Sequence, residues 1–210
     1  MLSLMITVVK SPFVQYKLTI LRNKKTTNTI FRQTMNETSY LIAADVLKHM
    51  PYKKTKVQTP LKSTNGTILA KQIILVPILR AGLGLLEGFT KFLPDAEKGH
   101  IGLYRDEQTY EPVEYLFKLP KIKNKKILIL DPMLATGNSS IAAIDLIRNK
   151  GANISDIILI SLLAAPEGLK NIQKKQKGIH IFTCSIDVKL DRNKFIVPGL
   201  GDAGDRYMGT

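Results

Sequence analysis

The sequence of 210 residues contains one cysteine, three histidines and no tryptophan. Because Cys184 is the only cysteine, no disulfide can form within the chain, which is typical of proteins from reducing compartments. His49, His100 and His180 lie far apart and lack the spacing of metal ligands, so we interpret them as structural or exposed residues. These shortages argue against a disulfide scaffold and a histidine metal centre.

Long apolar runs are also missing, and none is long enough to span a membrane. Residues 1–10 are mildly apolar, but their charge follows the apolar residues, so they make a poor signal peptide. We find no internal repeat, low-complexity tract or clear linker. The sequence therefore predicts a soluble cytoplasmic protein with no membrane partner.

Acidic residues are few, with 17 Asp and Glu against 31 Lys and Arg, which leaves a formal net charge of +14. A basic surface attracts anions, either nucleic acid or phosphorylated small molecules. The lysines occur in scattered pairs rather than in one dense patch, so we ascribe most of the charge to a general lysine bias. The pairs are Lys24-Lys25, Lys53-Lys54, Lys125-Lys126 and Lys174-Lys175.

The most informative stretch runs from Ile127 to Ile147. Four aliphatic residues predict a buried parallel strand, Asp131 follows, and a hydroxyl-rich turn from Ala135 to Ser140 opens a helical pattern. Such a turn leaves backbone N–H groups unpaired at the positive end of the helix dipole, which is a cradle for phosphate. An ordinary loop capped by Ser and Thr is the alternative. The convergence of an acid, Thr-Gly and further hydroxyls favours the cradle.

The remaining chain alternates between strands and helices, which predicts a mainly parallel twisted sheet with helices on both faces. Further strands are expected at 71–79, 100–105, 157–163 and 179–184, and helices at 12–22, in the stretch ending at Phe92, and after Pro166. Another helix is expected to start at the capping-box pattern Thr34–Glu37, with Leu41, Ala44 and Leu47 on one face, after a polar loop at 23–29. Residues 55–67, with Pro60 and Asn65-Gly66 as turn residues, indicate a hairpin. A second hairpin joins 100–105 to 113–119 through a polar tip.

Arginines follow two of the predicted strands. Arg80 and Arg105 would lie at strand carboxyl ends, where open α/β sheets bind ligands. An arginine that extends out of the core edge is the alternative for Arg80. The glycines after Arg80 do not complete a dinucleotide fingerprint, because Glu87 occupies the third position.

The last fifteen residues, 196–210, contain four glycines and two acids. A disordered terminus is one interpretation. The segment also has apolar anchors, among them Ile196, Leu200 and Tyr207. A glycine-rich loop held in place exposes backbone N–H and C=O groups in a fixed pattern, which can recognise a flat base edge.

Five motifs together resemble the uracil phosphoribosyltransferase family. They are Val76–Gly84, Tyr104–Glu107, Asp131–Gly137, Ala164–Gly168 and Pro198–Arg206. The resemblance is in order and spans nearly the whole chain. It implies a type I phosphoribosyltransferase fold with a β-hairpin excursion and a C-terminal hood loop. It also implies one domain over 1–210, made of a helical and hairpin region (1–70), a core sheet (71–186) and a base-binding tail (187–210).

The activity that the resemblance implies is conversion of uracil and 5-phospho-α-D-ribose 1-diphosphate (PRPP) to UMP and diphosphate in pyrimidine salvage. Mg²⁺ would bind with PRPP. Family members are dimers or larger, and some are activated by GTP. Two alternatives are kept: a related RNA- or DNA-binding regulator, favoured by the charge alone, and a transferase for another nucleobase.

The resemblance also assigns residue roles. Asp202, Arg105 and Asp131 are implied as catalytic, and the uracil contacts are Ile196, Gly201, Asp202 and Ala203. The PRPP contacts are Arg80, Arg105, Asp131, Pro132, Met133, Leu134, Ala135, Thr136, Gly137, Asn138, Ser139 and Asp202. No metal ligand is assigned, because Pro132 replaces the second acid of the wider superfamily.

Two other positions depart from the family pattern. Asn138 stands where a second glycine is common, and asparagine tolerates a left-handed backbone better than most residues. Tyr16 stands where a histidine is expected, in a helix that we expect to be distant from the chemistry.

Overall fold

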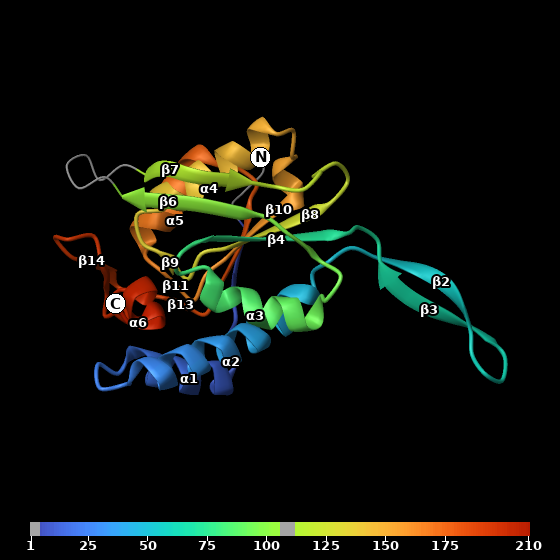
Figure 1. The fold of residues 1–210 in the computed structure, drawn as a ribbon, viewed down its shortest axis with the longest axis horizontal. Helices are drawn as coiled ribbons and strands as arrows, with labels where there is room; N and C mark the ends of the chain where they lie inside the picture. The colour runs from blue at the N-terminus through green and yellow to red at the C-terminus, as the bar shows by residue number, and fades with distance from the viewer. Residues whose placement is uncertain (1–4, 106–111) are drawn as a thin grey trace.

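The computed structural model describes residues 5–105 and 112–210, and its centre is a mainly parallel sheet (Figure 1). The strand order is β1-β12-β10-β8-β4-β6-β7, with a short β5 (Glu97–Lys98) paired beside β4. Only β7 runs antiparallel to its neighbour. The other bounds are Met5–Val8 (β1), Ile73–Leu79 (β4), His100–Arg105 (β6), Pro112–Lys118 (β7), Lys126–Leu130 (β8), Ile157–Ile160 (β10) and His180–Thr183 (β12).

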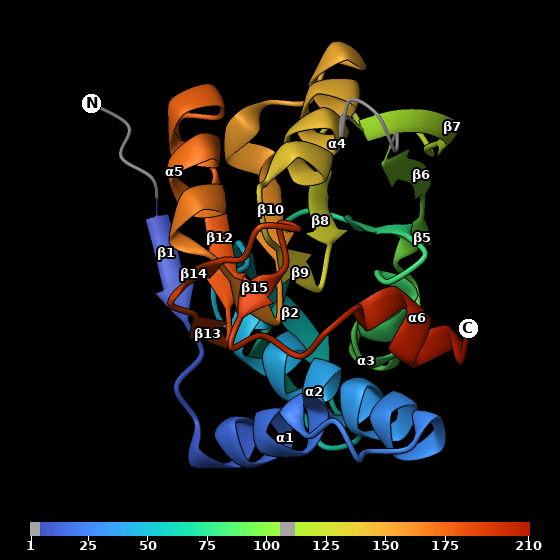
Figure 2. The ribbon, with the colours of Figure 1, turned by 90° about the vertical axis from the view of Figure 1, so that its left-hand side faces the viewer.

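Helices cover both faces of this sheet, as the sequence predicted. Alternate side chains of β8 enter opposite cores: Ile127 and Ile129 face one, and Leu128 and Leu130 face the other. This follows from the two-residue period of a strand. Figures 1 and 2 show α4 and α5 on the first face and α1, α2 and α3 on the second. The bounds are Pro12–Arg22 (α1), Asn28–Leu47 (α2), Leu83–Phe92 (α3), Asn138–Asn149 (α4) and Pro166–Lys175 (α5).

Helix α2 begins earlier than predicted. Thr27, not Thr34, is its N-cap, and its side chain accepts a hydrogen bond from the N–H of Ile30. Thr34 lies buried inside the helix. The predicted apolar face is confirmed in part: Leu41 and Leu47 pack against the core, but Ala44 is exposed, and the fully buried residues of this face are Ile42, Ala43 and Val46. The residues before Thr34 are mostly polar, which predicted a loop, but they form the first turn of α2, which packs against the core through Phe31.

The first predicted hairpin is confirmed, but its turn is not at Asn65-Gly66. Strands β2 (Tyr52–Gln58) and β3 (Ser63–Leu69) pair so that Asn65 and Gly66 lie within β3. The turn is at 59–62, where the Thr59 hydroxyl accepts from the N–H groups of Leu61 and Lys62. Figure 1 shows this hairpin extending away from the sheet as an arm.

The predicted hairpin of β6 and β7 is also confirmed, with its tip at 106–111 outside the described residues. Several short elements were not predicted. They are β1 at the sheet edge, a three-stranded sheet of β9 (Met133–Leu134), β11 (Leu163–Ala164) and β13 (Ser185–Ile186), the pair β14 (Lys189–Leu190) and β15 (Ile196–Val197), and the helix α6 (Ala203–Met208). In the described part of the chain, no helix has the length and apolarity needed to cross a membrane.

Helices α2 and α3 approach closely at Gly88. Its N–H donates to the Ser39 hydroxyl at 2.9 Å, and a Cβ added to Gly88 would lie 2.4 Å from the Ser39 carbonyl carbon and 2.5 Å from the Tyr40 nitrogen. Overpacking of this kind forces a backbone shift. We therefore expect Gly88→Ala to lower the free energy of unfolding by about 2 kcal/mol in urea denaturation.

The control is Lys91→Ala on the exposed face of α3, which should change stability by less than about 0.5 kcal/mol. Because the close atoms include backbone, adding Ser39→Gly should not restore the Gly88→Ala variant. Recovery in that double variant would contradict the backbone clash.

Candidate active site

The crevice of the sheet lies between the carboxyl ends of β4 and β8. These strands are neighbours and parallel, but the chain leaves β4 through α3 towards β6 and leaves β8 through α4 towards β10. Connections that diverge from adjacent strands open a crevice where α/β proteins bind ligands. Arg80 follows β4 and Asp131 follows β8, so the structure brings these predicted residues to one crevice.

A cleft of about 510 Å³ occupies this position. Four parts of the chain contribute to its wall: the end of β4, the β6–β7 hairpin, the turn after β8 and the tail. Its lining includes Arg80, Leu103, Tyr104, Tyr115, Asp131, Met133, Ala135, Ser139, Lys194, Phe195, Ile196, Gly201, Asp202, Ala203 and Gly204. The predicted sugar-phosphate and base segments therefore face the same space.

The predicted phosphate cradle is a strand–turn–helix unit. Gly137, the N-cap of α4, has a φ of 81°, a left-handed conformation that glycine adopts without steric cost. A hollow of about 30 Å³ lies over this turn and is lined by Asp131, Thr136, Asn138 and Ser139, among others. The first N–H groups of α4 follow directly, so the turn has the geometry of an anion site.

Asn138 fits the cradle without left-handed backbone. Among the described residues, Asn124 and Lys194 are the non-glycine positions with positive φ, and Asn138 is the first residue of α4. Its side chain is held from α5, because Asn171 Nδ2 donates to both Asn138 Oδ1 and the carbonyl of Thr136 at 2.9 Å. Asn171 thus braces the turn across α4 and α5.

Asp131 is partly buried at the floor of the cleft. Burial raises the pKa of its carboxyl group to about 6, against hydrogen bonds from Ser140 and the Met133 backbone that lower it. The Ser140 hydroxyl donates to Asp131 Oδ2 at 2.7 Å and fixes the orientation of the carboxylate. Ser140 was not assigned from the sequence, although it belongs to the hydroxyl-rich turn.

Arg80 reaches the tail across the cleft. Its Nη2 donates to Asp205 Oδ1 at 2.9 Å, and both side chains are about half exposed. Exposed ion pairs of this kind are weak, so a bound anion can replace the carboxylate. Arg105 ends β6 opposite Pro112, and its side chain lies outside the described part of the structure.

The tail is more ordered than a hood loop. Ile196, Leu200 and Ala203 are buried and hold it against the core. Asp202 is the N-cap of α6, and its Oδ1 accepts from the N–H of Asp205 at 2.9 Å. In Figure 2 the tail runs from β14 to α6 near the carboxyl end of β8.

Some predicted residues lie outside the cleft lining. Pro132 and Leu134 are buried, because β9 pairs with β11 beneath the turn. Tyr16 is exposed on α1 and stacks on Phe13. Several cleft residues were not assigned from the sequence, among them the larger side chains Tyr104, Tyr115, Lys194 and Phe195. Tyr104 begins the motif Tyr104–Glu107 and Lys194 and Phe195 lie just before Pro198–Arg206, whereas Tyr115 had no sequence signal.

The described residues include no group of three or more His, Cys, Asp or Glu side chains that could enclose a metal ion. The cleft offers two carboxylates, Asp131 from the turn after β8 and Asp202 from the tail. Mg²⁺ is commonly held by one or two carboxylates together with substrate phosphates and water. The donor set therefore fits a magnesium ion carried by a diphosphate substrate.

Comparisons with known proteins agree with this geometry. The family model described as Uracil phosphoribosyltransferase matches residues 8–210. A protein named uracil phosphoribosyltransferase from Streptococcus salivarius is 47% identical over 205 residues, which is 97% of each chain. The solved structure of the AQ2163 protein from Aquifex aeolicus superposes with a TM-score of 0.89 at 35% identity over 97% of both chains.

A more distant likeness concerns the fold alone. A hypoxanthine-guanine phosphoribosyltransferase from Bacillus anthracis superposes with a TM-score of 0.50 at 10% identity, covering 76% of this chain and 80% of the other. The match of the family model over nearly the whole chain, together with full-length relatives, establishes the family. The chain belongs to the uracil phosphoribosyltransferase family.

Proposed function

We propose that the protein transfers the phosphoribosyl group of PRPP to N1 of uracil. The bond from the anomeric carbon to the diphosphate oxygen breaks and a bond from that carbon to N1 forms. The N1 proton is released, so the products are UMP, diphosphate and a proton. The observation that carries this proposal is that the cleft lined by residues 201–203 and the hollow over the cradle of α4 share lining residues, Asp131 and Ser139 among them.

The turn after β8 is assigned to the sugar phosphate. The N–H groups at the start of α4 and the hydroxyls of Thr136 and Ser139 would bind the 5′-phosphate. Asp131, oriented by Ser140, would accept hydrogen bonds from the ribose hydroxyls. The ionised carboxylate accepts from hydroxyls more strongly than the protonated form, and its raised pKa therefore makes PRPP binding sensitive to pH near 6.

The tail is assigned to the base. The uracil edge presents an acceptor, a donor and an acceptor at O2, N3–H and O4. Backbone groups of Gly201, Asp202 and Ala203 in the order N–H, C=O, N–H would match it. Cytosine would leave a buried group unpaired, which is a strong basis for rejection.

Charge stabilisation is assigned to the arginines. Negative charge grows on the departing diphosphate, so fixed cations near it lower the barrier. Arg80 is available once its exposed contact with Asp205 opens. Arg105 is implied by the resemblance, and Mg²⁺ would supply Lewis-acid neutralisation of the diphosphate. Asp202 would stabilise positive charge on the ribose.

The proposal extends to assembly and location. The β2–β3 arm carries exposed apolar side chains, with Leu61 at 94% exposure, and offers surface to a second copy of the chain. We therefore propose a homodimer or larger homo-oligomer. GTP as an effector is carried only by the resemblance. A cytoplasmic location is consistent with the buried free thiol of Cys184.

Turnover of four bases tests the proposal directly. Purified protein with Mg²⁺ and PRPP should form a nucleotide from uracil and far less from cytosine, hypoxanthine or xanthine, as measured by chromatography. Preference for another base would indicate a different transferase. Failure with all four, combined with RNA binding that weakens steeply with salt, would indicate the regulator instead.

Asp202 combines a capping contact with the proposed catalytic role, and two variants separate them. Asp202→Ala loses both the cap and the charge, whereas Asp202→Asn keeps an oxygen for the N–H of Asp205. We expect both variants to lower kcat by a hundredfold or more, the scale of removing one preorganised charge partner. Near-normal turnover by Asp202→Asn would contradict the catalytic role and leave Asp202 only as the N-cap of α6.

Asp131 should destabilise the ligand-free protein. The pKa of its carboxyl group is about 6 in the folded protein and 3.8 in the unfolded chain. At pH values between these two, the folded protein therefore binds a proton that the unfolded chain has lost. The free energy of unfolding therefore falls as pH rises through this window, and the full cost is present above pH 6. Since water reaches the cleft, we expect the cost to be about 2 kcal/mol.

Asp131→Asn should consequently raise the melting temperature at pH 7.5 but not at pH 4, while PRPP binding is lost. The control Asp95→Asn removes the same charge from an exposed position and should change stability by less than about 0.5 kcal/mol at either pH. Equal melting temperatures of Asp131→Asn and wild type at pH 7.5 would contradict the buried charge.

A further inference from the structure

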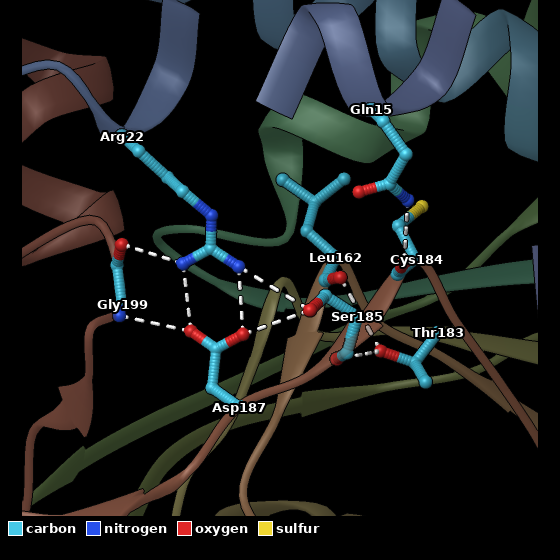
Figure 3. A network of polar contacts seen from close by, with 8 residues as sticks. All are labelled: Gln15, Arg22, Leu162, Thr183, Cys184, Ser185, Asp187 and Gly199. Carbon is cyan, nitrogen blue, oxygen red and sulfur yellow. Dashed lines mark hydrogen bonds and ion pairs between the residues drawn. The ribbon is translucent and has the colours of Figure 1, made fainter. Parts of the chain in front are cut away.

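The peptide groups of Gly199 are held by two side chains, Arg22 from α1 and Asp187 from the first position of the tail (Figure 3). Its N–H donates to Asp187 Oδ2 at 2.9 Å, and its carbonyl accepts from Arg22 Nη1 at 2.8 Å. Gly199 has a φ of 59°, and an added Cβ would lie 2.0 Å from the Ile196 carbonyl oxygen. Gly199 is therefore a fixed point in the tail, two residues before the proposed base contacts.

Arg22 and Asp187 form a two-pronged ion pair. Arg22 Nη1 donates to Oδ2 at 2.7 Å and Nη2 to Oδ1 at 2.6 Å, while the Ser185 hydroxyl donates to Oδ1 at 2.8 Å. Asp187 is 6% exposed. Burial acts to raise the pKa of Asp187, but the bonds from Arg22, Ser185 and Gly199 outweigh it, so the pKa lies below the usual value.

A second arginine, which belongs to the tail itself, binds the carbonyl of the next residue. Arg206 Nη1 donates to the carbonyls of Leu200 at 2.7 Å and Leu21 at 2.5 Å, and Nη2 donates to that of Asn23 at 2.8 Å. Its guanidinium lies over the Phe31 ring at 4.3 Å. Arg22 thus reaches from α1 to the tail, and Arg206 reaches from the tail to the end of α1.

These contacts separate tail residues whose carbonyls bind arginines from tail residues that line the cleft. The carbonyls of Gly199 and Leu200 are bound by arginines on the α1 side, and Gly201, Asp202 and Ala203 line the cleft. Neither Arg22 nor Asp187 lines the cleft. A buried ion pair is weak evidence for stability, because the cost of desolvation offsets its attraction. Its geometry, however, determines where the next peptide groups point.

We propose that Arg22 and Asp187 are positioning residues for base recognition. They orient the Gly199 peptide and through it the backbone groups that bind uracil, without touching either substrate. This inference rests on the proposed assignment of uracil to the tail. It predicts that damage to the pair weakens binding of the base and leaves binding of the sugar phosphate unchanged.

Two ligands separate these effects. UMP carries a base and a 5′-phosphate, and ribose 5-phosphate carries the phosphate alone. The dissociation constant of ribose 5-phosphate divided by that of UMP, both measured by calorimetry, reports the contribution of the base and cancels any general loss of folded protein. We expect Arg22→Met to lower this ratio at least tenfold, with KM for uracil raised and KM for PRPP within twofold of wild type.

Arg22→Lys keeps the positive charge but cannot bind both carboxylate oxygens of Asp187 at once, so its ratio should lie between those of wild type and Arg22→Met. The matched control is Lys17→Met on the same helix, which breaks the Lys17–Glu37 ion pair between α1 and α2 and should leave the ratio unchanged. Equal effects of Lys17→Met and Arg22→Met would overturn the proposal in favour of general loosening of α1.

A wild-type ratio in folded Arg22→Met would also overturn it. If that variant does not fold, Arg22→Lys and Asp187→Asn decide by the same ratio, and a wild-type value in both overturns the proposal. Equal affinity of the wild-type protein for UMP and ribose 5-phosphate is a separate result. It would contradict the base site itself rather than its positioning.

Discussion

The parallel pairing of β4 with β8 is the contact on which the candidate site depends. It places Arg80 and Asp131 at adjacent strand ends, and the divergence of α3 and α4 keeps the space above them open. Both strands are buried on both faces, so a one-residue slip in register would exchange their side chains between two differently packed cores. The position of the reacting groups is therefore a consequence of core packing.

Charged side chains occupy two positions where an apolar residue would pack at a lower desolvation cost. Asp131 remains ionisable in the cleft floor, and the Arg22–Asp187 pair lies beneath the tail. Each incurs a desolvation cost that an apolar residue would avoid. Asp131 lines the cleft beside the proposed sugar-phosphate cradle, and the Arg22–Asp187 pair supports the tail segment that leads to the proposed base contacts. On the assignments proposed above, these charges serve ligand recognition rather than stability.

Local patterns predicted most of the fold, because buried aliphatic runs and cap residues identify strands and helices without tertiary information. The start of α2 was missed because the residues before Thr34 are mostly polar, and the packing of Phe31 into the core shows that they form its first turn only once the fold is known. Strand β1 was missed because it is four residues long and partly exposed at an edge. In the site, the order of the motifs predicted that Asp131 and the tail contribute to one cleft. The role of Arg22 was not predicted, because its partners Asp187 and Gly199 lie far along the chain.

The distance in sequence between Arg22 and its partners bears on the order in which parts of the site can form during folding. The cradle joins residues within a stretch of about ten positions, whereas the contacts of Arg22 with Asp187 and Gly199 close loops of 165 and 177 residues. Loop closure of that length costs entropy before the contact is formed, and non-local contacts form late. If the two assignments are right, we expect a growing chain to complete the proposed phosphate site before the proposed base site. Anion binding would then precede base selectivity.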